Sequence, residues 1–296
     1  MPSSREMRIR IKSVKDLAQV TRALKTVSAS KVRKAVAANS ASYPYSQKAW
    51  SVLVSLAVQP GHTSLHPLLC ERKKINRVLV IMISSDRGLA GSYNVNVLRN
   101  TLEYFDKFEQ PVDYICIGKK GRDMLMRRKA KVIAEFTDLK DPAQFIDISP
   151  ISHLAVEDFL AGIYDQVYIS FTRYRSMTKQ TSEIRKILPL EVDRSSISKK
   201  IEVIGEKSVF TYEPEETEIL DEIIPRFTGM QIFQAVLSSQ ASEHAARTLA
   251  MSNATDNANE LVGILQLEYN KVRQQSITND MLDIVGGAAA QSQSQA

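Results

Sequence analysis

Apolar residues recur at seven-residue spacing through the last quarter of the chain, in two rows offset by four positions. The first row is Ile223, Met230, Leu237, His244, Met251, Ala258, Leu265 and Val272, and the second is Leu220, Phe227, Gln234, Ala241, Thr248, Thr255, Val262 and Tyr269. Two such rows are typical of a coiled-coil seam. Residues 226–285 contain no proline, so a single helix about 90 Å long is predicted. Such a helix needs a partner helix or a sleeve of other chains; a buried helix of a large all-α domain is the alternative.

The predicted seam is rich in small and polar residues. Ala241, Thr248, Thr255 and Ala258 are small, and His244 is polar. Small residues allow two helices to approach closely, although they bury little apolar area at about 25 cal/mol per Å². The pattern therefore favours a thin rod.

A second helix is predicted at the start of the chain, over residues 3–40. Its seam is predicted from six apolar residues: Ile11, Val14, Leu17, Val20, Leu24 and Val27. A kink or a short break is expected at Tyr43-Pro44-Tyr45, because proline removes a backbone donor and restricts the residue before it. The helix is expected to resume through Trp50 and to stop before Pro60.

The middle of the chain has a different pattern, with continuous apolar runs that alternate with helical stretches. Strands are predicted at 77–84, 112–117, 131–136 and 167–171, helices at 93–108, 119–129 and 150–165, and extended or hairpin structure at 178–189 and 201–212. Alternating strands and helices indicate an α/β fold with a mainly parallel sheet. The expected organisation is an N-terminal helix (1–58), a globular insert (59–212) and a C-terminal helix (213–296), with the two helices closing as an antiparallel pair.

Charge is distributed unevenly between the two ends. Residues 1–58 carry eleven lysines and arginines but only Glu6 and Asp16, whereas residues 213–296 carry twelve acidic and four basic residues. The two ends are therefore expected to attract each other or to face different partners. The two cysteines, Cys70 and Cys116, form no disulfide framework, which favours a reducing compartment. No apolar run of about 18 residues is present to span a membrane, and no secretory signal is recognised.

The sequence offers little catalytic chemistry. It has neither a P-loop nor a G-x-G-x-x-G fingerprint. The turn 84–91 follows the first strand, where ligands often bind, but Asp86 and Arg87 would put a carboxylate where a phosphate should sit. His62 and His66 lack an evident third metal ligand. His244, beside Glu243, is more typical of a satisfied buried histidine or a register device, and we expect no cofactor and no metal.

Several motifs resemble those of the gamma-subunit family of F-type ATP synthases. They lie at residues 10–15, 20–34, 85–91, 241–247, 251–257, 269–278 and 284–289, in order along essentially the whole chain. The resemblance implies a central rotor stalk without catalytic chemistry of its own. The terminal helices would form a coiled coil inside the alpha and beta subunits, and the Rossmann-like insert would bind epsilon and the membrane c-ring. There would be one copy per complex, and proton or sodium flow would turn it.

The resemblance also implies roles for individual residues. Positions matching beta-subunit contacts are Arg273, Gln274, Thr278, Lys31, Arg33 and Lys34. Asp86 and Arg87 match a collar contact, Tyr212 and Glu213 match a foot contact with epsilon or the c-ring, and Met281, Leu282, Ile284 and Val285 match an apolar bearing at the tip. From the residues alone, the cluster Lys31, Arg33 and Lys34 could equally be a solvated face.

Some positions depart from the family pattern. Ala90 stands where cysteine is frequent, and Asp280 stands where glutamate is more frequent. The segment 193–207 lacks the dithiol insertion of the chloroplast form, and no transit peptide is visible. These features favour a bacterial enzyme, peripheral on the cytoplasmic face of the plasma membrane.

Two functions of other classes remain as alternatives. The basic residues between 5 and 34 could belong to a coiled-coil adaptor that binds nucleic acid, whose affinity would fall with salt. The α/β insert could instead be a small-molecule enzyme. Neither alternative explains why the motifs extend over both ends of the chain.

Overall fold

The computed structural model describes residues 4–57, 67–72, 74–190 and 216–293. The chain divides into two compact units. One comprises Met1–Val27 with Thr248–Ala296, and the other is Ser28–Arg247. Helices α1 (Ser4–Ala57) and α6 (Glu216–Gln293) both contribute to each unit.

The unit Ser28–Arg247 is built on a five-stranded sheet in the order β3-β2-β1-β4-β5. The strands are β1 (Val78–Ile83), β2 (Val112–Ile117), β3 (Lys131–Phe136), β4 (Gln166–Tyr174) and β5 (Gln180–Leu188). The first four are parallel, and β5 runs antiparallel to β4 at one edge. All six residues of β1 are buried, as its continuous apolar run predicts. The predicted strands and the mainly parallel sheet are therefore confirmed.

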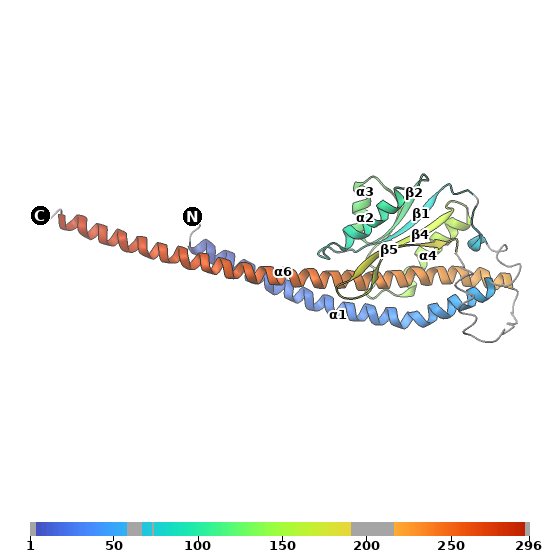
Figure 1. The fold of residues 1–296 in the computed structure, drawn as a ribbon, viewed down its shortest axis with the longest axis horizontal. Coiled ribbons are helices and arrows are strands. Elements are labelled where there is room, and N and C mark those ends of the chain that lie inside the picture. The colour runs from blue at the N-terminus through green and yellow to red at the C-terminus, as the bar shows by residue number, and fades with distance from the viewer. Residues whose placement is uncertain (1–3, 58–66, 73, 191–215, 294–296) are drawn as a thin grey trace. The chain divides into compact units, whose positions relative to one another are not determined.

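Helices cover both faces of this sheet (Figure 1). On one face, Val80 and Met82 of β1 pack with α2 (Tyr93–Phe105) and α3 (Lys119–Arg127). On the other face, Leu79 and Ile81 pack with α4 (Phe145–Leu160) and with α6, which contributes Ile232 and Val236. A short 3-10 helix, η1 (Pro67–Leu69), adds Leu68 to that second core. Because consecutive strand residues point to opposite faces, a single apolar strand supplies both cores.

The two terminal helices pair in antiparallel fashion, as predicted. In the unit that contains residue 8, Arg8 contacts Tyr269, Thr21 contacts Thr255 and Lys25 contacts Ser252. Residue numbers thus fall along α6 as they rise along α1. The predicted seam of α6 is confirmed over most of its length. Its buried members are Phe227, Met230, Leu237, Ala241, His244, Thr248, Met251, Thr255, Ala258 and Tyr269, and its half-buried members are Ile223, Gln234, Val262, Leu265 and Val272.

Half of the seam predicted for α1 is wrong. Leu17, Val20 and Val27 are between 54% and 56% exposed, whereas Ile11 is buried and Val14 and Leu24 are half-buried. The other buried positions of this helix are Met7, Ala18, Thr21, Ser28, Val32 and Ala35. The prediction chose leucine and valine because they are more hydrophobic than alanine, threonine and serine. Where two helices approach closely, however, small side chains such as Ala18 and Thr21 occupy the buried positions.

A break at Pro44, one of the two outcomes predicted there, does not occur, because α1 continues through this residue. A proline inside a helix costs about 3 kcal/mol in hydrogen bonding and clash. Tertiary packing on both sides offsets that cost: Ala38, Ala49 and Trp50 pack against the core, and Trp50 stacks on Phe227 with ring centroids 5.3 Å apart. Packing thus overrides local propensity in this helix.

Smaller differences concern element ends. Helix α4 begins at Phe145, five residues before its predicted start, with Gln144 N–H donating to the Asp147 carboxylate over 3.0 Å. Helix α6, predicted over 213–296, begins at Glu216 within an acidic run (215–222), and acidic residues are favoured at a helix N-terminus. The predicted extended segment 201–212 lies outside the described residues.

Candidate functional site

The carboxyl edge of the sheet, where doubly wound folds bind ligands, is closed at β1 by backbone and small side chains. Ser84 Oγ donates toward the carbonyls of Ile117 and Gly118 and accepts from the N–H of Gly121. A Cβ on Gly121 would lie 2.5 Å from Ser84 Oγ, and one on Gly118 would lie 2.5 Å from the Ser84 carbonyl oxygen. The strand and α3 are therefore too close for a phosphate to enter.

Asp86 completes this closure. Its two carboxylate oxygens accept hydrogen bonds from the backbone N–H groups of Lys119 (3.1 Å) and Asp138 (3.0 Å). Lys119 is the first residue of α3, so the carboxylate lies at a helix N-terminus, where an anion is favoured. The sequence-based expectation that a carboxylate replaces a phosphate here agrees with this geometry. Arg87, the next residue, is exposed.

The carboxyl end of β4 is covered by serines of α6. The N–H of Thr172 donates to Ser239 Oγ (3.1 Å), and the N–H of Tyr174 donates to Ser238 Oγ (2.9 Å). Ser242 Oγ donates to the carbonyl of Thr172 over 3.1 Å. The cavity that remains between this helix and the sheet measures about 40 Å³, which holds about one water molecule and no nucleotide.

A polar cluster on α6 faces the two loops beside the sheet. Arg247 donates to Glu243 over 2.7 Å and to the carbonyl of Gly88 over 3.2 Å. Burial raises the pKa of the Glu243 carboxyl, and the neighbouring Arg247 only partly opposes that effect. His244 Nε2 lies 2.8 Å from the Asp141 carboxylate, and Nδ1 lies 3.2 Å from Arg247 Nη1. Because arginine only donates, we assign the Nε2–H tautomer to His244.

Asp141 links three segments. It accepts from His244 on α6 and from Lys31 on α1, the latter over 2.9 Å. Burial of this carboxyl would raise its pKa, but the hydrogen bonds from His244 and Lys31 outweigh burial and lower the pKa to about 2. Lys31, one of the predicted partner-binding residues, is thus engaged within the chain, whereas Arg33 and Lys34 are exposed.

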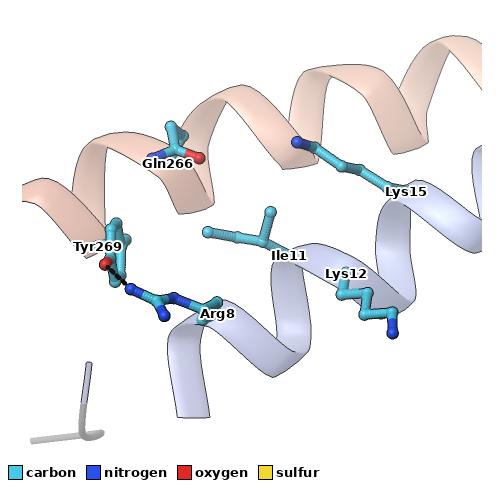
Figure 2. A pocket seen from close by; sticks show the side chains of 6 residues that line it. All are labelled: Arg8, Ile11, Lys12, Lys15, Gln266 and Tyr269. Carbon is cyan, nitrogen blue, oxygen red and sulfur yellow. Dashed lines mark hydrogen bonds between the residues drawn. The ribbon is translucent and has the colours of Figure 1, made fainter. Parts of the chain in front are cut away.

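The other unit carries a basic groove between the terminal helices, with a volume of about 450 Å³. Figure 2 shows Ile11 pointing between the helices and Arg8 reaching the hydroxyl of Tyr269, at 2.8 Å. The Arg8 guanidinium also lies over the Tyr269 ring, 5.7 Å from its centroid. Lys15 extends toward α6, whereas Lys12 points away from it (Figure 2).

Further along the pair, contacts are made by short side chains. The hydroxyls of Thr21 and Thr255 lie 2.8 Å apart and are buried. Each hydroxyl also lies within hydrogen-bond distance of a carbonyl of its own helix, that of Ala18 for Thr21 (3.0 Å) and that of Met251 for Thr255 (2.8 Å). Because each hydroxyl has a single hydrogen, one threonine donates to the other, and the threonine that accepts donates to its own carbonyl, so both buried hydroxyls are satisfied.

The predicted contact residues of the C-terminal segment are all exposed. Arg273, Gln274 and Thr278 lie on α6, where Thr278 Oγ1 donates back to the carbonyl of Gln274. The predicted apolar tip is exposed as well, at 62% for Met281, 64% for Leu282, 72% for Ile284 and 65% for Val285. Tyr212 and Glu213 lie outside the described residues.

Three residues to which the sequence analysis gave no role are central to the contacts of α6: Ser239, Gln240 and Ser242, the last of which lies within the motif 241–247. Their only sequence signal is a run of polar residues inside a buried helix.

Within the described residues, no group of three or more histidine, cysteine or acidic side chains could hold a metal ion. His62 and His66 fall outside those residues. Among the helices described, none combines the length and apolarity needed to cross a membrane.

Comparison with known proteins gives matches along the whole chain. A family model described as ATP synthase matches residues 3–291. The ATP synthase gamma chain of Dehalococcoides mccartyi (strain CBDB1) is 40% identical over 291 residues, covering 98% of this chain and 99% of that one. The gamma chain of Roseiflexus sp. (strain RS-1) is 41% identical over 293 residues, with the same coverage.

Solved structures agree in fold. A chain of the Euglena gracilis mitochondrial ATP synthase in rotational state 3 superposes with a TM-score of 0.66 and 21% identity, over 97% of this chain and 94% of that chain. A chain of the Tetrahymena thermophila mitochondrial ATP synthase, from its central stalk and c-ring, gives a TM-score of 0.61 and 21% identity, over 79% of this chain and 99% of that chain. At this identity the likeness shows the fold alone.

Proposed function

Because this chain belongs to the ATP synthase gamma-chain family, we propose that it is the central rotor stalk of a bacterial F-type ATP synthase. In this role it transmits torque between the membrane c-ring and the catalytic ring of alpha and beta subunits. It thereby couples proton or sodium flow to ATP synthesis or hydrolysis. The family identity is the premise, and the rotor role follows from it together with the fold.

The observation that carries this proposal is the antiparallel packing of the two chain ends. Arg8, Thr21 and Lys25 of α1 contact Tyr269, Thr255 and Ser252 of α6 in that order. A pair of helices joined by alanine and threonine is narrow, as a shaft inside a ring of subunits must be. A single helix of either end would lack the buried seam that stiffens the pair.

Exposed apolar residues support contact with a surrounding sleeve. Leu17 and Val20 of α1 are more than half exposed, as are Met281, Leu282 and Ile284 of α6. Exposed apolar surface of this kind marks an interaction site more often than a solvated face. We assign the tip Met281, Leu282, Ile284 and Val285 to an apolar bearing.

The charged contacts are assigned to the beta subunits and the lower collar. Arg273, Gln274 and Thr278 are exposed on α6, and Arg33 and Lys34 are exposed on α1; all five are assigned to contacts with beta-subunit loops. Lys31 contributes through the same face while it also binds Asp141. At the collar, Arg87 makes the contact, and Asp86 fixes the loop that presents it. Tyr212 and Glu213 remain the proposed foot contact with epsilon or the c-ring.

The proposal includes that the chain has no catalytic site of its own. It is supported by the closed carboxyl edge of the sheet, where α6 serines and Asp86 occupy the positions of a ligand. The location proposed is the cytoplasmic face of the bacterial plasma membrane, reached through the c-ring. A nucleic-acid adaptor and a small-molecule enzyme, the two alternatives, gain no support from the relatives.

Reconstitution with the alpha and beta subunits tests the function. The chain is expected to co-elute with them at one copy per complex and to restore ATP-driven rotation. Failure to assemble with them, while the chain itself is folded, contradicts the rotor role.

The beta-subunit contact has its own test. Gln274→Ala is expected to lower coupled ATP synthesis severalfold and to leave assembly intact. Gln275→Ala is the matched control, because it removes the same exposed side chain about 100° around the helix. Equal synthesis rates for the two variants would reject the contact at Gln274.

A further inference from the structure

One stretch of α6, Ser238–Arg247, is held by polar contacts from several directions. Every residue of this stretch is buried or half-buried. Strand β4 contacts it through Ser238, Ser239 and Ser242, as described above. The loop after β1 contacts it through Arg247, whose guanidinium donates to the carbonyls of Arg87 and Gly88. We call these contacts, with those of the third segment described next, the helix clamp.

The third segment is the loop between β3 and α4. Gln240 Oε1 accepts a hydrogen bond of 3.0 Å from the N–H of Ala143, and its Nε2 donates 2.8 Å to the carbonyl of Lys140. Only one orientation of the amide satisfies both partners, so the side chain is fixed in place. The same loop binds His244 through Asp141. Gln240 thus makes, with one amide, a donor and an acceptor contact to the same loop.

The clamp surrounds the helix. At about 100° per residue, its side chains extend over roughly two thirds of the helix circumference. The remaining third carries Leu237, Ala241 and Ala245, which are fully buried. Rotation of α6 about its own axis therefore breaks contacts on every side at once. Apolar packing alone would resist such rotation less, because hydrogen bonds weaken steeply when their angles change.

Most partners in the clamp are backbone atoms of the sheet domain. Thr172, Tyr174, Ala143, Lys140 and Gly88 all take part through main-chain N–H or carbonyl groups. Backbone atoms of a strand and of two short loops are held by the sheet, so they move less than side chains at the surface. The clamp therefore connects α6 to the main chain of β4 and of the two loops.

We propose that the helix clamp is the connection through which torque passes between the sheet domain and α6, and that Gln240 is its positioning residue. This proposal rests on the rotor function, because torque has a meaning only in a rotating assembly. The contacts of the clamp all lie within the unit Ser28–Arg247, whereas from Thr248 onward α6 belongs to the unit that it forms with Met1–Val27. Gln240 has no assigned contact to another subunit, so replacing it loosens the attachment of α6 to the sheet domain without removing such a contact.

The experiment measures, in the assembled complex, how stiffly the helix clamp attaches α6 to the sheet domain. The alpha and beta subunits are fixed to a surface, a gold nanorod is attached to the sheet domain, and its angular fluctuations are recorded at rest. Gln240→Leu is expected to increase the angular variance about twofold. Gln47→Leu, the same substitution at an exposed site on α1, is the matched control and is expected to leave the variance unchanged.

A second variant protects the test against misfolding. Ser239→Ala removes only the acceptor of the Thr172 N–H, and it is expected to increase the variance in the same direction by a smaller factor. A merely structural role of Gln240 predicts a lower melting temperature with unchanged variance in the complexes that assemble. Unchanged variance in both variants overturns the clamp proposal. Failure of the unmodified chain to assemble or rotate instead overturns the rotor function.

Discussion

The guanidinium of Arg8 donates a hydrogen bond of 2.8 Å to the hydroxyl of Tyr269, although 261 positions separate the two residues in the chain. Both residues also line the basic groove between the terminal helices. The hydrogen bond lowers the pKa of Tyr269, and a further contribution comes from Arg273; partial burial opposes both. Tyr269 therefore reports whether the two chain ends are in contact.

Replacing Arg8 tests this relationship. In Arg8→Met the pKa of Tyr269 is expected to rise, because the donor that stabilises the phenolate is lost. A tyrosine labelled with ¹³C at Cζ and titrated by NMR gives the direction of the shift. Arg10→Met, a change to an exposed arginine of the same helix, is the control. A Tyr269 titration that is identical in both variants would show that the helix ends are apart in solution.

The buried contact between Thr21 and Thr255 predicts how the seam responds to size. Thr255→Leu inserts a larger side chain into a closely packed position and is expected to destabilise the helix pair by about 1–3 kcal/mol. Hydrogen exchange of residues 248–262 measures the local opening free energy. Thr26→Leu, on the exposed face of α1, should change that free energy by less than about 0.5 kcal/mol. Similar protection in the two variants would contradict a narrow seam.

Two helical glycines are expected to respond in opposite directions to alanine. A Cβ on Gly121 would meet Ser84 Oγ at 2.5 Å and Met82 Cε at 2.7 Å, whereas nothing lies within 4 Å of one on Gly263. Gly121→Ala should therefore destabilise the sheet domain by about 1–3 kcal/mol. Gly263→Ala should stabilise its helix by about 0.5–1 kcal/mol. Chemical denaturation of the two variants gives the sign of each change in the free energy of unfolding. Destabilisation by Gly263→Ala would contradict the exposed position of this glycine.

Asp141 makes the sheet domain sensitive to acid. Its pKa in the folded chain is about 2, below the ordinary value of 3.8. The ionised carboxylate therefore adds stability above pH about 4, and that contribution is lost as the pH falls through 2. Because the group is partly exposed, its contribution is expected to be within about 1 kcal/mol.

The corresponding measurement compares the chain with Asp141→Asn. The difference in unfolding free energy is expected to shrink as the pH falls from 5 to 2. Lys31→Met keeps the carboxyl but removes one of its donors, so the same loss should occur at a higher pH. A difference that stays constant with pH would show that the carboxylate is not held by His244 and Lys31.

The sequence predicts some parts of this structure well for a physical reason. The strands could be located because β1 is buried on both faces and reads as a continuous apolar run. The seam of α6 could be located because Met251 and Tyr269 are large enough to mark it. In α1 the same reasoning selected Leu17 and Val20, which are exposed, and missed Ala18 and Thr21, which are buried. Seven-residue spacing cannot reveal a seam made of small residues when larger ones occupy another face.

The helix clamp on α6 shows a second limit of prediction from the sequence. Ser239 and Gln240 resemble ordinary polar residues of a helix, and only the tertiary structure shows that they bind the backbone of β4 and of the loop before α4. Asp86 could be assigned to the carboxyl edge of the sheet from its position after β1. Its role in joining Lys119 to Asp138 required the loops to be placed in three dimensions.

The outward-facing Leu17, Val20 and Val27 have a consequence for biosynthesis. In a newly made chain these side chains meet water, because the narrow seam has no space for them. Exposed apolar surface of this kind favours self-association. Synthesis of this chain in step with the subunits that cover these side chains is therefore expected to limit its self-association.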